Sequence, residues 1–165
     1  IVQKEYITQP GLILKKLRKE IIRALKQKGE HGEQKDGMDM ALCVIDLKTL
    51  MLQYAGANNP LYIIREKNKE NVHGAKLAEG LTHSLYEIKG DKMPIAIHVK
   101  MDKFQMHEIK LMKGDSIYMF SDGYADQFGG DQITKKGKKY KYKQTCQCIC
   151  HCRRCIVSST FESVD

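Results

Sequence analysis

Residues 40–62 constrain the fold more than any other part of the chain. Residues 40–45 (Met-Ala-Leu-Cys-Val-Ile) form an apolar run without alternation of polar and apolar side chains, and residues 50–55 form a second extended segment. Only Asp46–Thr49 separates them, and so short a link makes neighbouring strands antiparallel. An antiparallel strand with one face in water should alternate. The missing alternation therefore predicts a sheet that is covered on both faces.

An amphipathic helix earlier in the chain can supply one of the two covers. Pro10 and Gly11 open this helix and Gly29 ends it. Its apolar side chains recur at helical spacing, and a basic face lies opposite: Leu14, Leu17, Ile21 and Leu25 against Lys15, Lys16, Arg18, Lys19 and Lys26. Such a helix could lie on an anionic membrane, but packing on the sheet also explains the covered strands. The expected fold is α/β, a four-layer α/β/β/α sandwich with mainly antiparallel sheets.

Further extended segments follow the hairpin along the chain. We expect strands at 61–64, 85–88, 94–99, 104–111 and 116–120. The intervening stretch 67–82 is charged and contains glycine, and it is predicted to be a loop or an excursion of the chain.

The net charge of +8 is concentrated near the C-terminus. From residue 132 onward eight Lys and Arg oppose two acidic residues, a net of +6, which leaves 8 − 6 = +2 for residues 1–131. This nearly balanced body argues against nucleic-acid binding. Its only cysteine, Cys43, lies in the apolar run and is expected to be a buried thiol, which suits a reducing cytoplasm. No apolar run reaches the roughly 18 residues of a membrane span, and we expect no membrane contact by this segment.

The remaining five cysteines lie within the basic tail, residues 132–165. Their spacing, Cys-x-Cys-x-Cys-x-Cys-x-x-Cys, lacks the two separated Cys-x-x-Cys pairs of structural zinc sites. A zinc module is one interpretation of the tail. We prefer the other, an unstructured or non-native tail, which arises where translation left its natural frame or where the tail is otherwise unselected.

The end of the last apolar strand carries the best candidate for a functional residue. Asp122 follows residues 116–120 and precedes Gly123, where the backbone can turn and approach a ligand. A carboxylate at a strand end can coordinate a hard cation such as Mg²⁺ or Mn²⁺, although Asp in this position also caps helices. Asp126 lies one helical turn further on, where it could face the same ion or be a solvated acid.

Two other segments place polar side chains beside predicted strands. Asp36 and Asp39 precede the strand at 40–45, and Asn58 follows the strand at 50–55. Turn residues are the default interpretation of all three, and a cleft at the strand ends is the alternative. No His is paired with another His at ligand spacing, and no serine-centred nucleophile elbow is present.

Four stretches together resemble the SpoIIE-like branch of the PPM-type serine/threonine phosphatases. They occur in the family's order and cover most of residues 10–131: Asp36–Leu42, Tyr54–Tyr62, Lys92–Ile95 and Gly114–Gly130. The resemblance implies an α/β/β/α sandwich whose central cleft holds two Mn²⁺ or Mg²⁺ ions. In such a site the ions activate a water that attacks phosphoserine directly.

The resemblance also assigns roles to individual residues. It makes Asp122, within Ser-Asp-Gly, a metal ligand, and it places Asp126 where some members bind an additional ion. The family's earlier Asp motifs and its late Asp-Asp motif have no counterpart, and Ala96 stands where relatives usually have Gly. The sandwich is therefore expected to be incomplete at both ends, with residues 1–131 a partial phosphatase domain and residues 132–165 unlike the family.

The implied function of the parent protein is metal-dependent hydrolysis of phosphoserine or phosphothreonine. Its partner would be a signalling phosphoprotein of the anti-sigma-factor antagonist type in the bacterial cytoplasm, and the fragment alone is expected to be inactive. The alternative is a catalytically dead PPM-like module that binds proteins for regulation.

Overall fold

The computed structural model describes residues 1–29, 36–99, 101–121, 123, 128–129 and 138–139. Within these residues the elements follow in this order: α1 (Val2–Glu5), α2 (Pro10–Ala24), β1 (Met40–Asp46), β2 (Met51–Ala57), β3 (Leu61–Glu66), β4 (Ala75–Glu79), β5 (His83–Ile88), β6 (His107–Lys110), β7 (Ser116–Tyr118), β8 (Phe128–Gly129) and β9 (Lys138–Lys139). None of these helices is long and apolar enough to cross a membrane.

The strands form two larger sheets in which every pairing is antiparallel. One sheet has the order β1-β2-β6 and the other the order β4-β5-β3-β7. The predicted hairpin is confirmed, because β1 and β2 pair over their full lengths, from Met40 opposite Ala57 to Asp46 opposite Met51. The carboxylate of Asp46 closes its turn by accepting hydrogen bonds from the backbone N–H groups of Lys48 at 2.8 Å and Thr49 at 3.2 Å.

The main core lies between the two sheets. Buried side chains from both meet there: Leu52, Tyr54, Leu61, Ile63, Val72, Tyr86, Ile88, Ile109 and Leu111. From β1, Ala41, Cys43 and Ile45 pack against this cluster. These are alternate residues of the strand, so they share one of its two faces. Cys43 is half-buried rather than fully buried.

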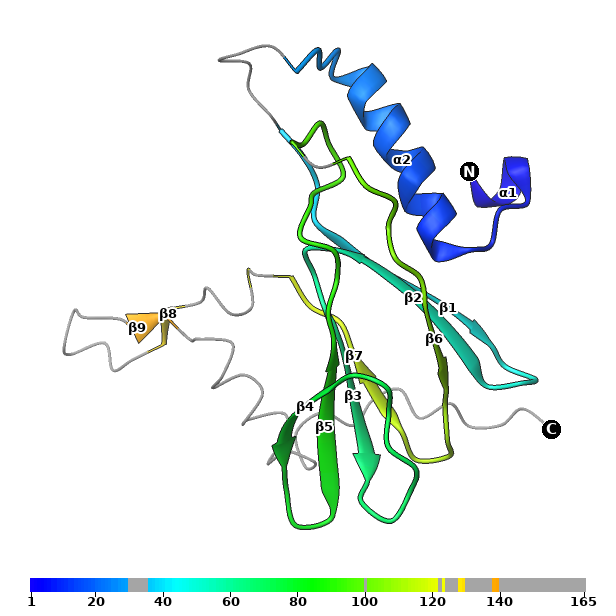
Figure 1. Ribbon diagram of the computed structural model, residues 1–165, viewed down its shortest axis with the longest axis vertical. Helices are drawn as coiled ribbons and strands as arrows, with labels where there is room; N and C mark the ends of the chain where they lie inside the picture. The colour runs from blue at the N-terminus through cyan, green and yellow to red at the C-terminus, as the bar shows by residue number, and fades with distance from the viewer. Residues whose placement is uncertain (30–35, 100, 122, 124–127, 130–137, 140–165) are drawn as a thin grey trace.

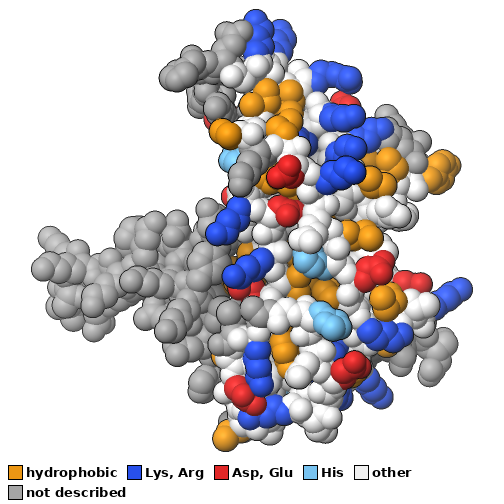
Figure 2. All heavy atoms as spheres, viewed as in Figure 1, with side chains coloured by type: hydrophobic (Ala, Val, Ile, Leu, Met, Phe, Trp, Pro, Cys, Tyr) orange, Lys and Arg blue, Asp and Glu red, His pale blue; other side chains and the backbone are white. Residues whose placement is uncertain are grey.

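Helix α2 covers the other face of the β1-β2-β6 sheet (Figure 1). Leu14 packs with Ala55 and Ala57 of β2, and Met40 and Leu42 of β1 pack against the same cluster. Both faces of β1 are therefore covered, as the missing alternation predicted. The outer surface of α2 is basic: Lys15, Lys19 and Arg23 are exposed, and Lys and Arg side chains gather over the helix in Figure 2.

The arrangement of one long helix on two antiparallel sheets confirms the predicted α/β class. The outer face of the β4-β5-β3-β7 sheet is also apolar. Tyr62, Ile64 and Leu85 are buried there, and Tyr118 and Phe120 pack against them.

Two sequence-based expectations about the strands were wrong. Within residues 94–99 the structure has a single isolated bridge, between Met38 and Ile95, because Pro94 lacks the N–H that would continue a ladder. The predicted loop 67–82 contains β4, whose pairing with β5 shifts register between Lys76 and Ala78. The charges of β4 concealed it, since an edge strand can point Lys and Glu side chains into water.

Candidate functional site

The antiparallel β1–β2 hairpin brings two of the predicted site residues together. Met40 pairs with Ala57, so Asp39 just before β1 lies beside Asn58 just after β2. The Asn58 side-chain Nδ2 donates a hydrogen bond to Asp39 Oδ1 at 2.8 Å, and both residues are exposed. Asn58 has a φ of 59°, a left-handed conformation that Asn tolerates better than most residues. Sequence reasoning placed both residues at strand ends, and the structure confirms that placement.

A third segment, distant in sequence, joins these strand ends through its backbone. The N–H of Asn58 donates to the carbonyl of Asp91 at 2.8 Å, and the N–H of Asp91 donates to the carbonyl of Gly56 at 2.9 Å. The Asp91 carboxylate accepts a hydrogen bond from the N–H of Gln105 at 2.7 Å. A Cβ at Gly56 would overlap the Tyr54 hydroxyl and the carbonyl oxygen of Asn59. The close approach therefore requires glycine at position 56.

The backbone of Asp36 is held by the side chain of Gln27, which follows helix α2. The buried side chain of Gln27 donates to the carbonyl of Asp36 at 2.5 Å and accepts the N–H of Ile97 at 3.2 Å. The side chain of Asp36 is exposed. Of the three predicted cleft residues, the structure thus links two directly and places the third on a neighbouring backbone segment.

Arg18 was expected on the basic outer face of its helix, and that expectation was wrong. Arg18 is only 5% exposed and lies 4.1 Å from the centre of the Phe104 ring. Its guanidinium donates to the Asp102 carbonyl at 3.0 Å and to the Met93 sulfur at 3.2 Å. Burial lowers the pKa of Arg18, and the charges of Asp91 and Asp102 partly oppose that shift. Arg18 therefore anchors α2 to the segment that carries Asp91.

Strand β7 leads towards the predicted metal ligand, and two contacts fix its ends. At its C-terminal side, the Phe120 ring stacks on the Tyr62 ring with centroids 5.0 Å apart and an interplanar angle of 2°. At its N-terminal side, Asp115 accepts hydrogen bonds from Arg65, the shortest at 2.6 Å from Nη2 to Oδ2. Both side chains of this ion pair are 3% exposed.

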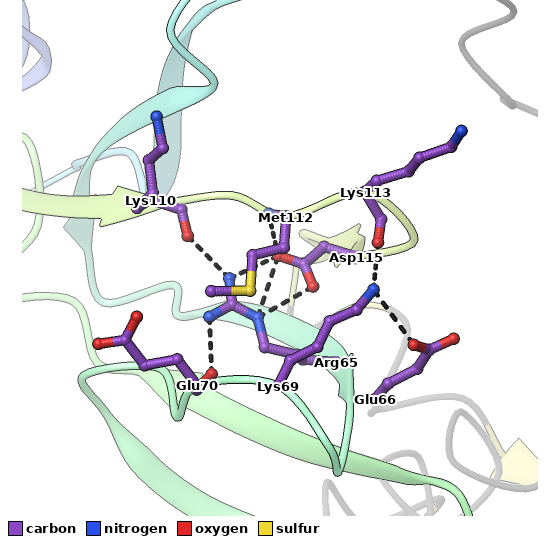
Figure 3. Close-up of polar contacts among 8 residues, drawn as sticks. All are labelled: Arg65, Glu66, Lys69, Glu70, Lys110, Met112, Lys113 and Asp115. Carbon is purple, nitrogen blue, oxygen red and sulfur yellow. Dashed lines mark hydrogen bonds and ion pairs between the residues drawn. The ribbon is translucent and has the colours of Figure 1, made fainter.

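Figure 3 shows that Arg65 binds several segments at once. Besides Asp115, its guanidinium donates to the carbonyl of Glu70 at 2.9 Å and to the carbonyl of Lys110 at 2.8 Å. Asp115 also accepts the N–H of Met112 at 2.9 Å. Arg65 lies on β3 and Lys110 on β6, so this network clamps the two sheets together. Sequence reasoning missed Arg65, because only its distant partners distinguish it from a solvated arginine.

The predicted ligands Asp122 and Asp126 lie outside the described residues, as does most of the basic tail. Gly123 is described and exposed. Elsewhere in the described ranges, no group of three or more His, Cys, Asp or Glu side chains could hold a metal ion. This donor set of the described residues does not by itself fit a two-metal centre.

Comparison with known proteins gives two matches. The family model described as stage II sporulation protein E (SpoIIE) matches residues 4–154. A solved structure, the SiaA-PP2C domain of Pseudomonas aeruginosa, superposes with a TM-score of 0.62 at 20% sequence identity. The superposition covers 90% of this chain and 48% of that chain. A search of curated proteins found no match.

The two matches show which fold the chain shares and over which residues it matches the family. At 20% identity the SiaA-PP2C likeness shows a shared fold, of which this chain spans about half. The family match runs past residue 131, where the resemblance was expected to stop. The pairing of β8 with β9 also crosses that position. The boundary at residue 131 stays a prediction.

Proposed function

Because this chain belongs to the SpoIIE family and has the fold of a PPM-type phosphatase domain, we propose that its parent protein is a protein phosphatase acting on phosphoserine or phosphothreonine. One observation carries the proposal. Three stretches that bear the family resemblance, 36–42, 54–62 and 92–95, meet at one end of the β1-β2-β6 sheet. The Met38–Ile95 bridge joins the first to the third, and the bridge from Ala57 to Asp91 joins the second to the residue just before the third. A catalytic cleft likewise draws its residues from segments that lie far apart in sequence.

The metal requirement follows from the family, since PPM phosphatases are generally metal-dependent. We propose Mn²⁺ or Mg²⁺ as the ions, two in the complete site, with Asp122, Gly123 and Asp126 at the metals. Asp36, Asp39 and Asn58 would line the cleft beside them. When bound, two such ions supply an activated water and neutralise charge on the phosphoryl group. The role of Asn58 is then to hold the exposed Asp39 carboxylate in one orientation through the 2.8 Å hydrogen bond.

The substrate is proposed to be a signalling phosphoprotein of the anti-sigma-factor antagonist type in the bacterial cytoplasm. Residues 1–131 would be the partial phosphatase domain and residues 132–165 a tail that takes no part in catalysis. The alternative is a catalytically dead PPM-like module that binds proteins for regulation.

Paired aspartate substitutions in the parent protein test the proposal. Asp122→Asn should abolish Mn²⁺-dependent hydrolysis of a phosphoserine peptide and weaken Mn²⁺ binding, while the melting temperature stays close to that of the wild type. Asp46→Asn is the matched control, because Asp46 closes the hairpin turn away from the cleft, and it should keep the rate.

Two results would contradict the phosphatase proposal. Wild-type parent protein that binds Mn²⁺ but releases no phosphate would support the catalytically dead module. Full hydrolysis by the Asp122→Asn variant would remove Asp122 from the site. For the 165-residue chain alone we expect no turnover of p-nitrophenyl phosphate above a Mn²⁺ blank.

A further inference from the structure

The segment from residue 91 to residue 105 reaches the candidate site without joining a sheet ladder. Its described residues form two isolated bridges, at Asp91 and at Ile95. At its start, the backbone of Asp91 is hydrogen-bonded to Gly56 and to Asn58 of the candidate site. A segment with so few ladder hydrogen bonds depends on other contacts for a fixed position.

The two ends of this segment meet, and Arg18 of α2 lies across the place where they meet. The Asp91 carboxylate accepts the N–H of Gln105 at 2.7 Å, which closes the segment into a loop. On one side of this closure, Arg18 Nη2 donates to the sulfur of Met93 at 3.2 Å. On the other side, Nη1 donates to the carbonyl of Asp102 at 3.0 Å. One side chain therefore holds both ends of loop 91–105 against the helix.

Helix α2 supports the same loop at further points along its length. The Arg18 guanidinium lies 4.1 Å from the centre of the Phe104 ring. A Cβ at Gly11 would come within 2.9 Å of the Phe104 carbonyl oxygen, so the start of the helix lies directly on the loop. Just after the helix, the Gln27 side chain accepts the N–H of Ile97. The helix and the loop thus run side by side (Figure 1).

The environment of Arg18 is unfavourable for a residue that serves stability alone. Arg18 is buried, and its Nε has no hydrogen-bond partner among the described residues. The acceptors described for it are a carbonyl oxygen and a thioether sulfur, and the sulfur is a weak acceptor. A buried charge can often be replaced by an apolar side chain of similar volume without loss of stability. Proteins depart from such local rules mainly at functional sites.

We propose, resting on the phosphatase function proposed above, that Arg18 is a positioning residue for the candidate site. Arg18 fixes loop 91–105 against α2, and the loop in turn presents the Asp91 carbonyl to the N–H of Asn58. The side chain of Asn58 orients the Asp39 carboxylate. Arg18 acts through these contacts, because it is buried beneath the helix and its described partners belong to the loop.

Hydrogen exchange on the 165-residue chain tests the positioning role without any activity. Arg18→Met keeps a long unbranched side chain but removes the charge and both donors. The amides of Asn58 and Asp91 should then exchange about 10–100-fold faster, because two hydrogen bonds that hold the loop are lost. The amides of β3, in the other sheet, should change much less. Arg23→Met is the matched control, because Arg23 lies on the same helix with its side chain 80% exposed, and it should exchange like the wild type.

A conservative variant provides the rescue. Arg18→Lys keeps a positive charge beside the Phe104 ring, but it cannot reproduce the planar fork that reaches two acceptors. Its Asn58 and Asp91 amides should exchange at rates between those of the wild type and Arg18→Met. The same variant carries the test if Arg18→Met fails to fold. In the parent protein, kcat for a phosphoserine peptide should fall by about 10–100-fold in Arg18→Met and recover in part in Arg18→Lys.

The outcomes separate this role from the phosphatase function itself. Equal acceleration of the Asn58, Asp91 and β3 amides would make Arg18 a structural residue and would overturn the proposal. Wild-type exchange at Asn58 and Asp91 in Arg18→Met, or an active parent protein whose kcat is unchanged by Arg18→Met, would overturn it as well. A wild-type parent protein that releases no phosphate would overturn the proposed function alone, because the exchange experiment requires no activity.

Discussion

Replacing Arg65 with Met should destabilise the chain more than any other single substitution of a charged residue that we propose. The change removes the buried partner of Asp115 together with the donors to the carbonyls of Glu70 and Lys110. Asp115 would keep one hydrogen bond, from the N–H of Met112. At 3% exposure, water cannot replace the lost donors. Breaking a buried ion pair from one side costs about 3–5 kcal/mol, a large part of the roughly 5–15 kcal/mol that holds a domain together.

Urea unfolding measures this loss directly. With a slope of about 2 kcal/mol per molar urea, a cost of 3–5 kcal/mol lowers the midpoint by roughly 1.5–2.5 M. Lys67→Met is the control. Lys67 forms an ion pair with Glu79, and the two side chains are 37% and 51% exposed, respectively. Solvent-exposed pairs contribute little, so the control midpoint should barely move.

A double substitution separates the cost of an unpaired buried charge from the cost of altered packing at the same position. Arg65→Met combined with Asp115→Leu removes both charges, so no buried charge is left without its partner. We expect the double variant to be more stable than Arg65→Met alone. The reasoning is refuted if Arg65→Met unfolds at the midpoint of Lys67→Met, or if the two single losses simply add.

Two further predictions concern the candidate site and strand β1. Gly56→Ala should lower the free energy of unfolding by about 1–3 kcal/mol, because the added Cβ overpacks against Tyr54 and Asn59. Gly80→Ala is the control and should leave the urea midpoint almost unchanged, because a Cβ there has its nearest neighbour atom at an ordinary 3.4 Å. Equal midpoints for the two variants would contradict the close approach at Gly56. Burial raises the pKa of the Cys43 thiol to about 12, above its value in the unfolded chain, so Cys43 should stay protonated and react slowly with a disulfide reagent at pH 8, and this slow phase should be missing in Cys43→Ala. The same shift means that the contribution of Cys43 to stability is complete below the unfolded pKa and is lost as the pH rises towards 12.

The sequence predicted the elements whose signals are local. The unbroken apolar run at residues 40–45 indicated a strand covered on both faces, and the structure places it between the main core and α2. The spacing of Leu14, Leu17 and Ile21 indicated the helix. These signals survive without tertiary information because hydrophobic periodicity follows from the geometry of a single element.

The candidate site was predictable only in part. Strand ends and glycines indicated where Asp39, Asn58 and Gly56 lie, but not that Asp91 joins them through two backbone hydrogen bonds. The resemblance to a phosphatase family supplied the chemistry assigned to Asp122, which periodicity alone would equally assign to a helix cap.

The fate of the two arginines was decided by tertiary structure alone. Arg18 and Arg65 look like any other basic residues in the sequence, yet they are 5% and 2% exposed. A guanidinium can be buried only where acceptors converge on it, and those acceptors come from residues 93, 102, 110 and 115, far along the chain. The amino-acid sequence by itself determined which faces of the helix and strands are apolar. Contacts between distant segments determined which charges are buried, because the free energy of burying a charge depends on its partners in space and not on its neighbours in sequence.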